Sequence, residues 1–157
     1  REANRYHPSR HLHMMEPPSP EPVYTVTVKD HLMIAHSLRG ATFGPAQQLH
    51  GATYMVSAIF QSHTLNSDSI VIDIGKAREL LQSALDRLRY ANLDTLPEFE
   101  GRNTTTEFLC RYFHQVLSGK LDGSFAGRLT IELEESPVAG ASYSAQVPAG
   151  ATEKADS

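Results

Sequence analysis

The stretch Ile34-Ala-His-Ser-Leu-Arg-Gly-Ala-Thr-Phe-Gly-Pro-Ala-Gln-Gln-Leu-His-Gly-Ala-Thr-Tyr54 joins two strand-like segments and decides how the first half of the chain folds. Residues 23–33 before it are rich in β-branched side chains and open with period-two alternation. Residues 53–60 after it alternate in the same way. A hairpin would bring His36, at the end of the first strand, beside His50, just before the second. Two such imidazoles could share a metal ion, or each could be a hydrogen-bonded histidine at a strand end.

Farther along the chain, the spacing of apolar residues changes to three and four, which is typical of amphipathic helices. Residues 76–90 show this spacing, and Asp73 just before them is expected to mark the entry to the helix. Residues 104–117 show it again. This second helix opens on a Thr-x-x-Glu pattern, which predicts a capping box between Thr104 and Glu107.

The last part of the chain returns to strand patterns. Residues 128–134 alternate cleanly, and residues 141–147 form a weaker strand after a turn that contains proline and glycine. The order β-β-α-α-β-β predicts an α+β fold, with one four-stranded antiparallel sheet and two helices on one face. Such a sheet has two free edges, which a soluble protein must cover or pair. Pairing with neighbouring subunits would solve this, so the pattern favours a homo-oligomer.

The length of 157 residues corresponds to about one domain, placed at residues 23–147. Residues 1–22 are interrupted by prolines and predict a flexible lead-in. This segment could be a tag or an over-extended start. Residues 148–157 are small and polar, and they predict a disordered tail.

Composition excludes several classes of partner. The net charge of −4 and the pI near 6.0, without a basic stripe, predict no nucleic-acid partner. No apolar run approaches the roughly 20 residues that span a bilayer, so no membrane partner is expected. The single cysteine, Cys110, excludes an internal disulfide and fits a reducing, cytoplasmic setting.

Five short patches then point to a known family. Ala35-His36-Ser37-Leu38 and Leu49-His50-Gly51-x-x-Tyr54 resemble the two-part signature of the 6-pyruvoyl-tetrahydropterin synthase and 6-carboxytetrahydropterin synthase family. Three more patches follow in the family's order: Val71-Ile-Asp-Ile-Gly75, Asn103-Thr-Thr-Thr-Glu107, and Glu135-Ser-Pro137 with Tyr143. The resemblance covers residues 23–147. It implies the T-fold, or tunnelling fold, whose subunits join their sheets into a barrel, with hexamer-like assembly and sites at subunit interfaces.

The resemblance also implies a site. In that family three histidines hold a zinc ion, which binds the side-chain hydroxyls of 7,8-dihydroneopterin triphosphate. A cysteine supported by an Asp-His pair moves protons, and a glutamate holds the pterin ring. Carried over by position, the resemblance gives two zinc ligands and four ring-binding residues: His36 and His50, then Glu135, Thr105, Thr106 and Glu107.

The reactive positions of the family differ here. Its third histidine falls on Ala52 and its cysteine on Ala46, and neither side chain can bind a metal or carry a proton. Its Leu-Asp-His reads Leu88-Arg89-Tyr90. The catalytic residues are therefore unknown. Arg89, which could bind a phosphate or carboxylate, and Tyr90, which could donate a proton, are weak candidates.

Two functional hypotheses stay open. In the first, the protein is a carbon–oxygen lyase that acts on 7,8-dihydroneopterin triphosphate or an analogue by an altered mechanism, with His31 or His63 completing a zinc site. In the second, it is a non-catalytic protein that binds a pterin or purine-like heterocycle, or that acts as a scaffold. Glu107 could also serve only the helix cap.

Overall fold

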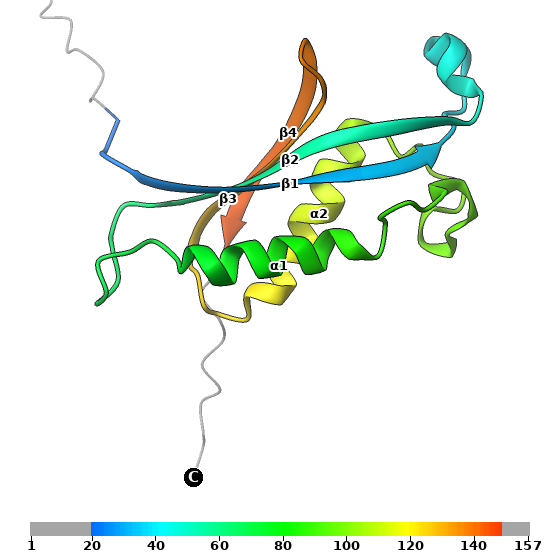
Figure 1. Ribbon diagram of the computed structural model, residues 1–157. Coiled ribbons are helices and arrows are strands. Elements are labelled where there is room, and N and C mark those ends of the chain that lie inside the picture. The colour runs from blue at the N-terminus through cyan, green and yellow to red at the C-terminus, as the bar shows by residue number, and fades with distance from the viewer. Residues whose placement is uncertain (1–19, 149–157) are drawn as a thin grey trace, which may run out of the picture.

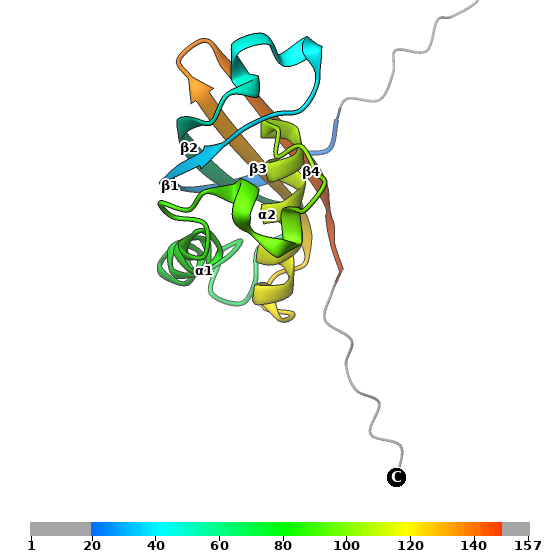
Figure 2. The same ribbon diagram turned by 90° about the vertical axis from the view of Figure 1, so that its right-hand side faces the viewer.

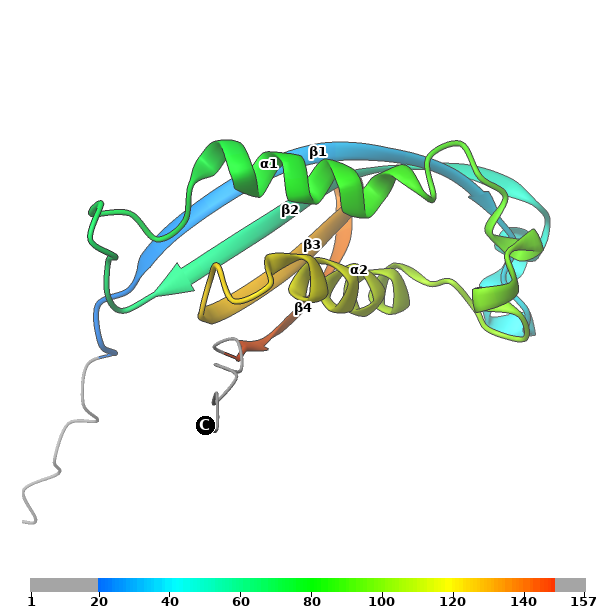
Figure 3. The ribbon, with the colours of Figure 1, turned by 90° about the horizontal axis from the view of Figure 1, so that it is seen from below.

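The computed structural model describes residues 20–148, which form one sheet covered by helices on one face (Figure 1). The antiparallel strands lie in the order β1-β2-β3-β4, with bounds β1 Tyr24–His36, β2 His50–Ser62, β3 Gly127–Ser136 and β4 Ala139–Val147. Helices α1, Ile74–Asp86, and α2, Thr106–Leu121, both cross the same face of this sheet (Figure 3). The predicted α+β T-fold is confirmed. The predicted lead-in and tail lie almost wholly outside the described residues.

Strand alternation puts one face of the sheet into the core. On β2, Tyr54, Val56, Ala58 and Phe60 are all fully buried, as the sequence pattern predicted. They pack with residues from both helices and from β3, chiefly Leu81, Leu85, Leu109, Phe113, Leu117, Leu129 and Ile131. The opposite face carries mostly exposed side chains, such as Thr53 and Met55. Figure 2 shows the resulting two layers, with both helices on one side of the strands.

Helix α1 is shorter than predicted. Its N-cap is Asp73, whose side chain accepts a hydrogen bond from the Lys76 N–H at 2.9 Å, so the expected role of Asp73 at the helix entry is confirmed. It ends at Asp86 and not at Tyr90. Leu88 remains buried after the helix ends, and Tyr90 has a left-handed φ of 58°. The apolar spacing in the sequence extends past the end of the helix because Leu88, which lies in the following turn, also packs into the core.

The N-cap of helix α2 lies one residue later than predicted. Thr105, and not Thr104, is the N-cap, and its hydroxyl accepts from the Phe108 N–H at 3.2 Å. The predicted Thr104–Glu107 capping box is therefore wrong. The Thr104 hydroxyl is buried and bonds to the ring of His36 instead. At its other end the helix runs on to Leu121.

The segment after α1 covers part of the edge of β1. The Tyr90 N–H donates to the Met33 carbonyl at 2.7 Å, and the Ala35 N–H donates to the Ala91 carbonyl at 2.9 Å. Asn92 forms a parallel bridge with Ala35. Only the end of β1 is covered in this way. Within the described residues, the rest of β1 and the outer edge of β4 have no strand partner.

Loops gather at the same end of the sheet. The short 3-10 segment η1, Ala41–Gln47, joins β1 to β2. Asn103 ties its base, because its side chain accepts from the Arg39 N–H at 2.8 Å and donates to the Arg39 carbonyl at 2.9 Å. Ser37 donates both its N–H and its hydroxyl to Asp94. Across residues 20–148, no helix is both long enough and apolar enough to cross a membrane.

Candidate functional site

A pocket of about 330 Å³ lies where the ends of β1 and β2 meet the start of α2 and the β3–β4 hairpin. Its polar lining residues are His36, His50, Tyr54, Thr105, Thr106, Glu107 and Glu135. Its apolar wall includes Leu38, Phe43, Ala46, Ala139 and Ala141. The fold therefore gathers in one pocket the six residues for which the sequence predicted metal or ring binding.

The two histidines stand side by side, as the hairpin argument predicted. His36 pairs directly with His50 in the sheet register, and their ring centroids are 4.7 Å apart. His50 Nδ1 donates to the Gln48 carbonyl at 2.8 Å, and His36 Nδ1 lies 3.0 Å from the Thr104 hydroxyl. Among the described residues neither Nε2 has a hydrogen-bond partner. Because the Gln48 carbonyl only accepts, the neutral form of His50 carries its proton on Nδ1 and has a lone pair on Nε2.

Burial lowers the pKa of His36, and the neighbouring His50 lowers it further. The bond to Thr104 and the charges of Asp94 and Glu135 oppose this shift only in part. His36 is therefore neutral at neutral pH. Each ring has one nitrogen occupied by the protein, which is the arrangement that orients metal-binding histidines.

The donor set does not complete a zinc site. A catalytic zinc ion normally has three protein ligands, and this pocket provides two histidines. Ala52 lies on the same face of β2 as His50 and Tyr54, so the family's third histidine would face the pocket, but alanine has no donor atom. Residues 20–148 contain no group of three or more His, Cys, Asp or Glu side chains that could hold a metal ion. The described residues therefore do not fit a three-ligand zinc centre.

Neither of the two histidines considered as replacements is near the pair. His31 differs in parity from His36 along β1, so its side chain leaves from the opposite face of the sheet. His63 follows the far end of β2, roughly 40 Å from His50 at the rise of an extended strand. Its ring bonds to the Pro22 carbonyl at 2.9 Å. The hypothesis that His31 or His63 completes the site within one chain is wrong.

A β-bulge places Glu135 at the pocket. The register between β3 and β4 shifts between Glu134 and Ser136, so Glu135 is the extra residue. It follows the inward-facing Ile131 and Leu133 in alternation, and bulges commonly re-aim a side chain next to a site. Thr106, in the first turn of α2, donates its hydroxyl to Glu135 Oε2 at 3.4 Å. That bond is long, so most of the carboxylate's accepting capacity is open to a ligand.

The start of α2 forms the wall opposite the histidines. The Thr105 hydroxyl caps the helix, while Thr106 and Glu107 occupy its first turn beside the pocket. Glu107 has an exposed side chain, and a carboxylate in the first turn interacts favourably with the helix dipole. Thr105 and Glu107 thus have local roles in the helix as well as a place in the pocket lining.

Tyr54 lines the pocket although sequence reasoning gave it no functional role. Its side chain is fully buried, and its hydroxyl has no hydrogen-bond partner among the described residues. Burial raises the pKa of Tyr54 to about 12, and the neighbouring Thr106 hydroxyl opposes this shift only in part. The sequence signal was available, because Tyr54 is the only tyrosine among the alternating residues of the buried face of β2.

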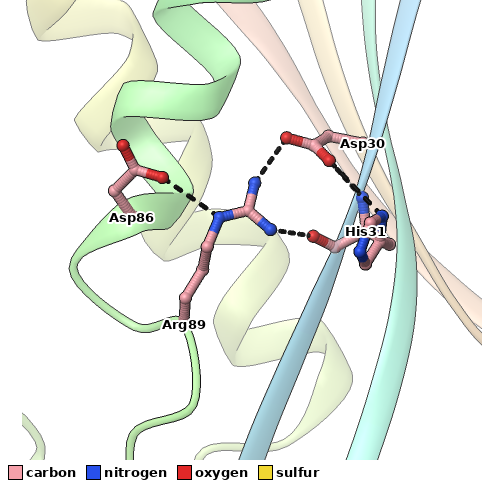
Figure 4. A network of polar contacts seen from close by, with 4 residues as sticks. All are labelled: Asp30, His31, Asp86 and Arg89. Atoms are coloured by element: carbon pink, nitrogen blue, oxygen red, sulfur yellow. Dashed lines mark hydrogen bonds and ion pairs between the residues drawn. The ribbon is translucent and has the colours of Figure 1, made fainter.

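Arg89 and Tyr90, the weak catalytic candidates, lie outside this pocket. Figure 4 shows the Arg89 guanidinium between helix α1 and strand β1. It donates to Asp86 at 3.0 Å, to the His31 carbonyl at 2.6 Å and to Asp30 at 2.5 Å. Tyr90 is 78% exposed and does not line this pocket. Within one chain, Arg89 acts as a link between two elements.

Comparison with solved structures supports the same fold. The chain is similar to 6-pyruvoyl tetrahydropterin synthase from Caenorhabditis elegans, with a TM-score of 0.69 and 21% identity over 79% of this chain and 96% of the other. It is also similar to the enzyme from Plasmodium vivax, with a TM-score of 0.69 and 16% identity over 80% and 99%. An uncharacterized protein from Wolinella succinogenes matches at a TM-score of 0.55 and 14% identity over 78% and 98%. At these identities the likeness concerns the fold alone.

Comparison of sequences gives the family. No curated protein matches the chain. The family model described as 6-pyruvoyl tetrahydropterin synthase matches residues 25–146, which is nearly the whole described region. The resemblance inferred from five short patches is thereby confirmed. The chain belongs to the 6-pyruvoyl tetrahydropterin synthase family.

Proposed function

We propose that this pocket binds a pterin or a related purine-like heterocycle, with Glu135 as the main anchor. The observation that carries the proposal is the Glu135 carboxylate, which a bulge turns toward the pocket and which has only one long bond, to Thr106. A carboxylate can accept two parallel hydrogen bonds from a guanidine-like edge, such as the 2-amino and ring N–H groups of a pterin. The volume of about 330 Å³ suits a small bicyclic ring.

The other polar groups support this kind of ligand. His50 offers a free Nε2 lone pair, and the neutral His36 ring lies against it. They form a wall that can accept hydrogen bonds from ligand hydroxyl groups. Phe43 and Leu38 add apolar surface for a flat ring. We infer no step that uses zinc, because residues 20–148 provide no third ligand beside His36 and His50.

The geometry favours binding over the family's reaction. Ala46, at the position that the resemblance assigns to the cysteine, lines the pocket with a methyl group. Arg89, at the position of the relay carboxylate, is occupied by Asp30 and Asp86. A non-catalytic binding protein is therefore our first candidate. A carbon–oxygen lyase that acts on 7,8-dihydroneopterin triphosphate or an analogue is the second, and the retained His36–His50 pair favours it.

Assembly belongs to the same proposal. Most of β1 and the outer edge of β4 expose unpaired backbone groups. We propose that copies of the chain join these edges into a barrel of the hexamer-like kind. Tyr90, exposed beside the β1 edge, would then be available to a neighbouring copy.

The test of ring binding is the variant Glu135→Gln, titrated with pterin by fluorescence or calorimetry. It keeps the shape of the side chain and removes the charge, so we expect affinity to fall at least tenfold, since hydrogen bonds to charged groups contribute about 1.5–3 kcal/mol. The matched control is Glu134→Gln, whose exposed side chain leaves from the other face of β3. Equal affinities in wild type and Glu135→Gln would remove Glu135 from the proposal.

A turnover assay separates the two candidates. The protein is incubated with 7,8-dihydroneopterin triphosphate and the release of inorganic triphosphate is followed. Release at about 1 s⁻¹ or faster, within the ordinary range of enzymes, would establish the lyase. Saturable pterin binding without release would establish the binding protein.

A further inference from the structure

Two methionines lie on the face of the sheet that the helices leave uncovered. Met33 on β1 and Met55 on β2 are each 42% exposed. They are the only exposed large hydrophobic side chains on this face of the described strands, where neighbours such as Thr53 and Glu134 are polar. A single exposed methionine needs no explanation. These two, however, are both neighbours of one histidine.

The strand register brings that histidine and the two methionines together. His31 pairs directly with Met55, and Met33 follows His31 by two residues on the same face of β1. In an antiparallel pair, Cβ atoms directly opposite each other are about 5 Å apart and diagonal neighbours are about 7 Å apart. A methionine side chain is long and has three rotatable bonds. Both thioether sulfurs and the imidazole can therefore reach one point above the sheet.

The surroundings of His31 favour a bound cation. Its side chain is 61% exposed, and its Nδ1 lies 3.6 Å from Asp30 Oδ1 (Figure 4). Among the described residues no hydrogen bond involves its Nε2. A carboxylate beside one ring nitrogen is the arrangement that orients metal-binding histidines. On the far side of Met55, its partner on β3 is Glu134, which adds a negative charge to the same row of side chains.

We propose that His31, Met33 and Met55 form a binding site for Cu(I) on the outer face of the sheet. Thioethers are soft ligands that select Cu(I), and imidazole also suits copper. Zinc, by contrast, is held in proteins by cysteine, histidine and carboxylate groups. The site uses no residue of the pocket, so the inference does not depend on ring binding.

The test uses the full chain, labelled with carbon-13 at the methionine methyl groups and titrated with Cu(I) under anaerobic, reducing conditions. The chain has four methionines and therefore gives four methyl signals, which single Met-to-Leu variants assign. We expect the signals of Met33 and Met55 to shift together and to saturate at one equivalent, whereas Zn²⁺ should shift neither. Met14 and Met15, next to His13, offer Cu(I) a competing place, and their own signals report it separately.

Competition with a chromophoric Cu(I) chelator, followed through the Met33 signal, gives the affinity of this site alone. Met55→Leu keeps the volume of the side chain and removes the sulfur, so the Tm should not change. We expect the affinity to fall about tenfold or more, because even the loss of a group that only orients a ligand costs roughly 10- to 100-fold. His31→Gln should have the same effect. The matched control is His63→Gln, whose side chain is also 61% exposed but follows the far end of β2.

Three results would overturn the inference. In the first, the Met14 and Met15 signals shift and those of Met33 and Met55 do not, so the metal binds elsewhere. In the second, His31→Gln leaves the affinity unchanged, so the imidazole is no ligand. In the third, His63→Gln weakens binding as much as His31→Gln does, which would show binding by any exposed histidine.

Discussion

The pocket and the segment after α1 use polar side chains in opposite ways. In the pocket, the Nε2 atoms of His36 and His50 have no partner among the described residues, and Glu135 has one long bond. After α1, all three guanidinium nitrogens of Arg89 are bonded to protein oxygens. Both regions hold positions that the family resemblance connects with chemistry. Only the pocket leaves its polar groups open to a ligand.

The difference shows how one family frame can separate into a binding part and a structural part. Arg89 joins Asp86 on α1 to Asp30 and the His31 carbonyl on β1 (Figure 4). The next residues extend this contact, because Tyr90 and Ala91 form hydrogen bonds with the β1 edge. A position to which the resemblance assigns proton chemistry serves in this chain to hold a helix end against a strand. Stability and ligand affinity should therefore respond to different residues.

The largest effect expected is from Arg89→Ala. The Arg89 and Asp30 side chains are only 22% and 25% exposed, so the variant leaves Asp30 and the His31 carbonyl without their partner. We expect the free energy of unfolding to fall by about 2 kcal/mol in urea titrations, with pterin affinity unchanged. The control is Arg111→Ala on the exposed face of α2.

Arg89→Lys sharpens this test. A lysine keeps the charge but lacks the planar fork that reaches three oxygens, so its stability should lie between those of wild type and Arg89→Ala. Wild-type stability together with a loss of pterin affinity in either variant would contradict the structural role assigned to Arg89. Arg89 would then contact ligand, from its own chain or from a neighbouring copy.

A middle effect is expected from Thr104→Val, which keeps the shape of the side chain and removes the hydroxyl that meets His36. Both residues are at most 2% exposed, so His36 Nδ1 would lose its partner inside the core. We expect a loss of about 1 kcal/mol in the free energy of unfolding. Nitrogen NMR shifts of the His36 ring should show a changed tautomer balance.

Thr53→Val on the exposed face of β2 is the matched control for Thr104→Val and should change neither property. Wild-type stability together with an unchanged His36 ring in Thr104→Val would show that Thr104 does not orient the pocket histidine. The role assigned to Thr104, which is to orient the His36 ring at the pocket, would then be wrong.

Local patterns were sufficient to predict the sheet and much of the pocket. Alternation on β2 and β3 gave the buried faces, and the connection between the first two strands predicted that His36 meets His50. The same alternation leads from Ile131 and Leu133 to Glu135, where the bulge between β3 and β4 lies. These features depend on neighbours a few residues apart or on one hairpin, so the sequence carries them directly.

The features that the sequence did not predict depend on contacts between distant residues. By local sequence, Thr104 fits a capping box as well as Thr105 fits an N-cap. Thr104 does not cap the helix because its hydroxyl bonds to His36, which is 68 residues away in the sequence. The sequence suggested that Arg89 binds a ligand, but its guanidinium donates to Asp30, which is 59 residues away in the sequence. The end of α1 was missed because Leu88 belongs to the core without belonging to the helix. Periodicity does not contain such information.

The smallest effect concerns Cys110, which lies on α2 between the pocket and the core. Its reactivity shows whether the accessible surface of the pocket extends as far as this thiol. Its thiol is fully buried and donates to the Ala141 carbonyl at 3.3 Å, and burial raises its pKa to about 11. The unfolded thiol ionises near pH 9, so between these values the unfolded chain binds fewer protons and stability falls as pH rises. Urea titrations from pH 8 to 9.5 should show this decline, and Cys110→Ala should reduce its slope. The native thiol should also react slowly with a thiol reagent at pH 8, since the reactive form is the thiolate. Rapid reaction in the folded protein would show that Cys110 is accessible, like the open groups of the pocket. The accessible region would then extend one turn farther along α2.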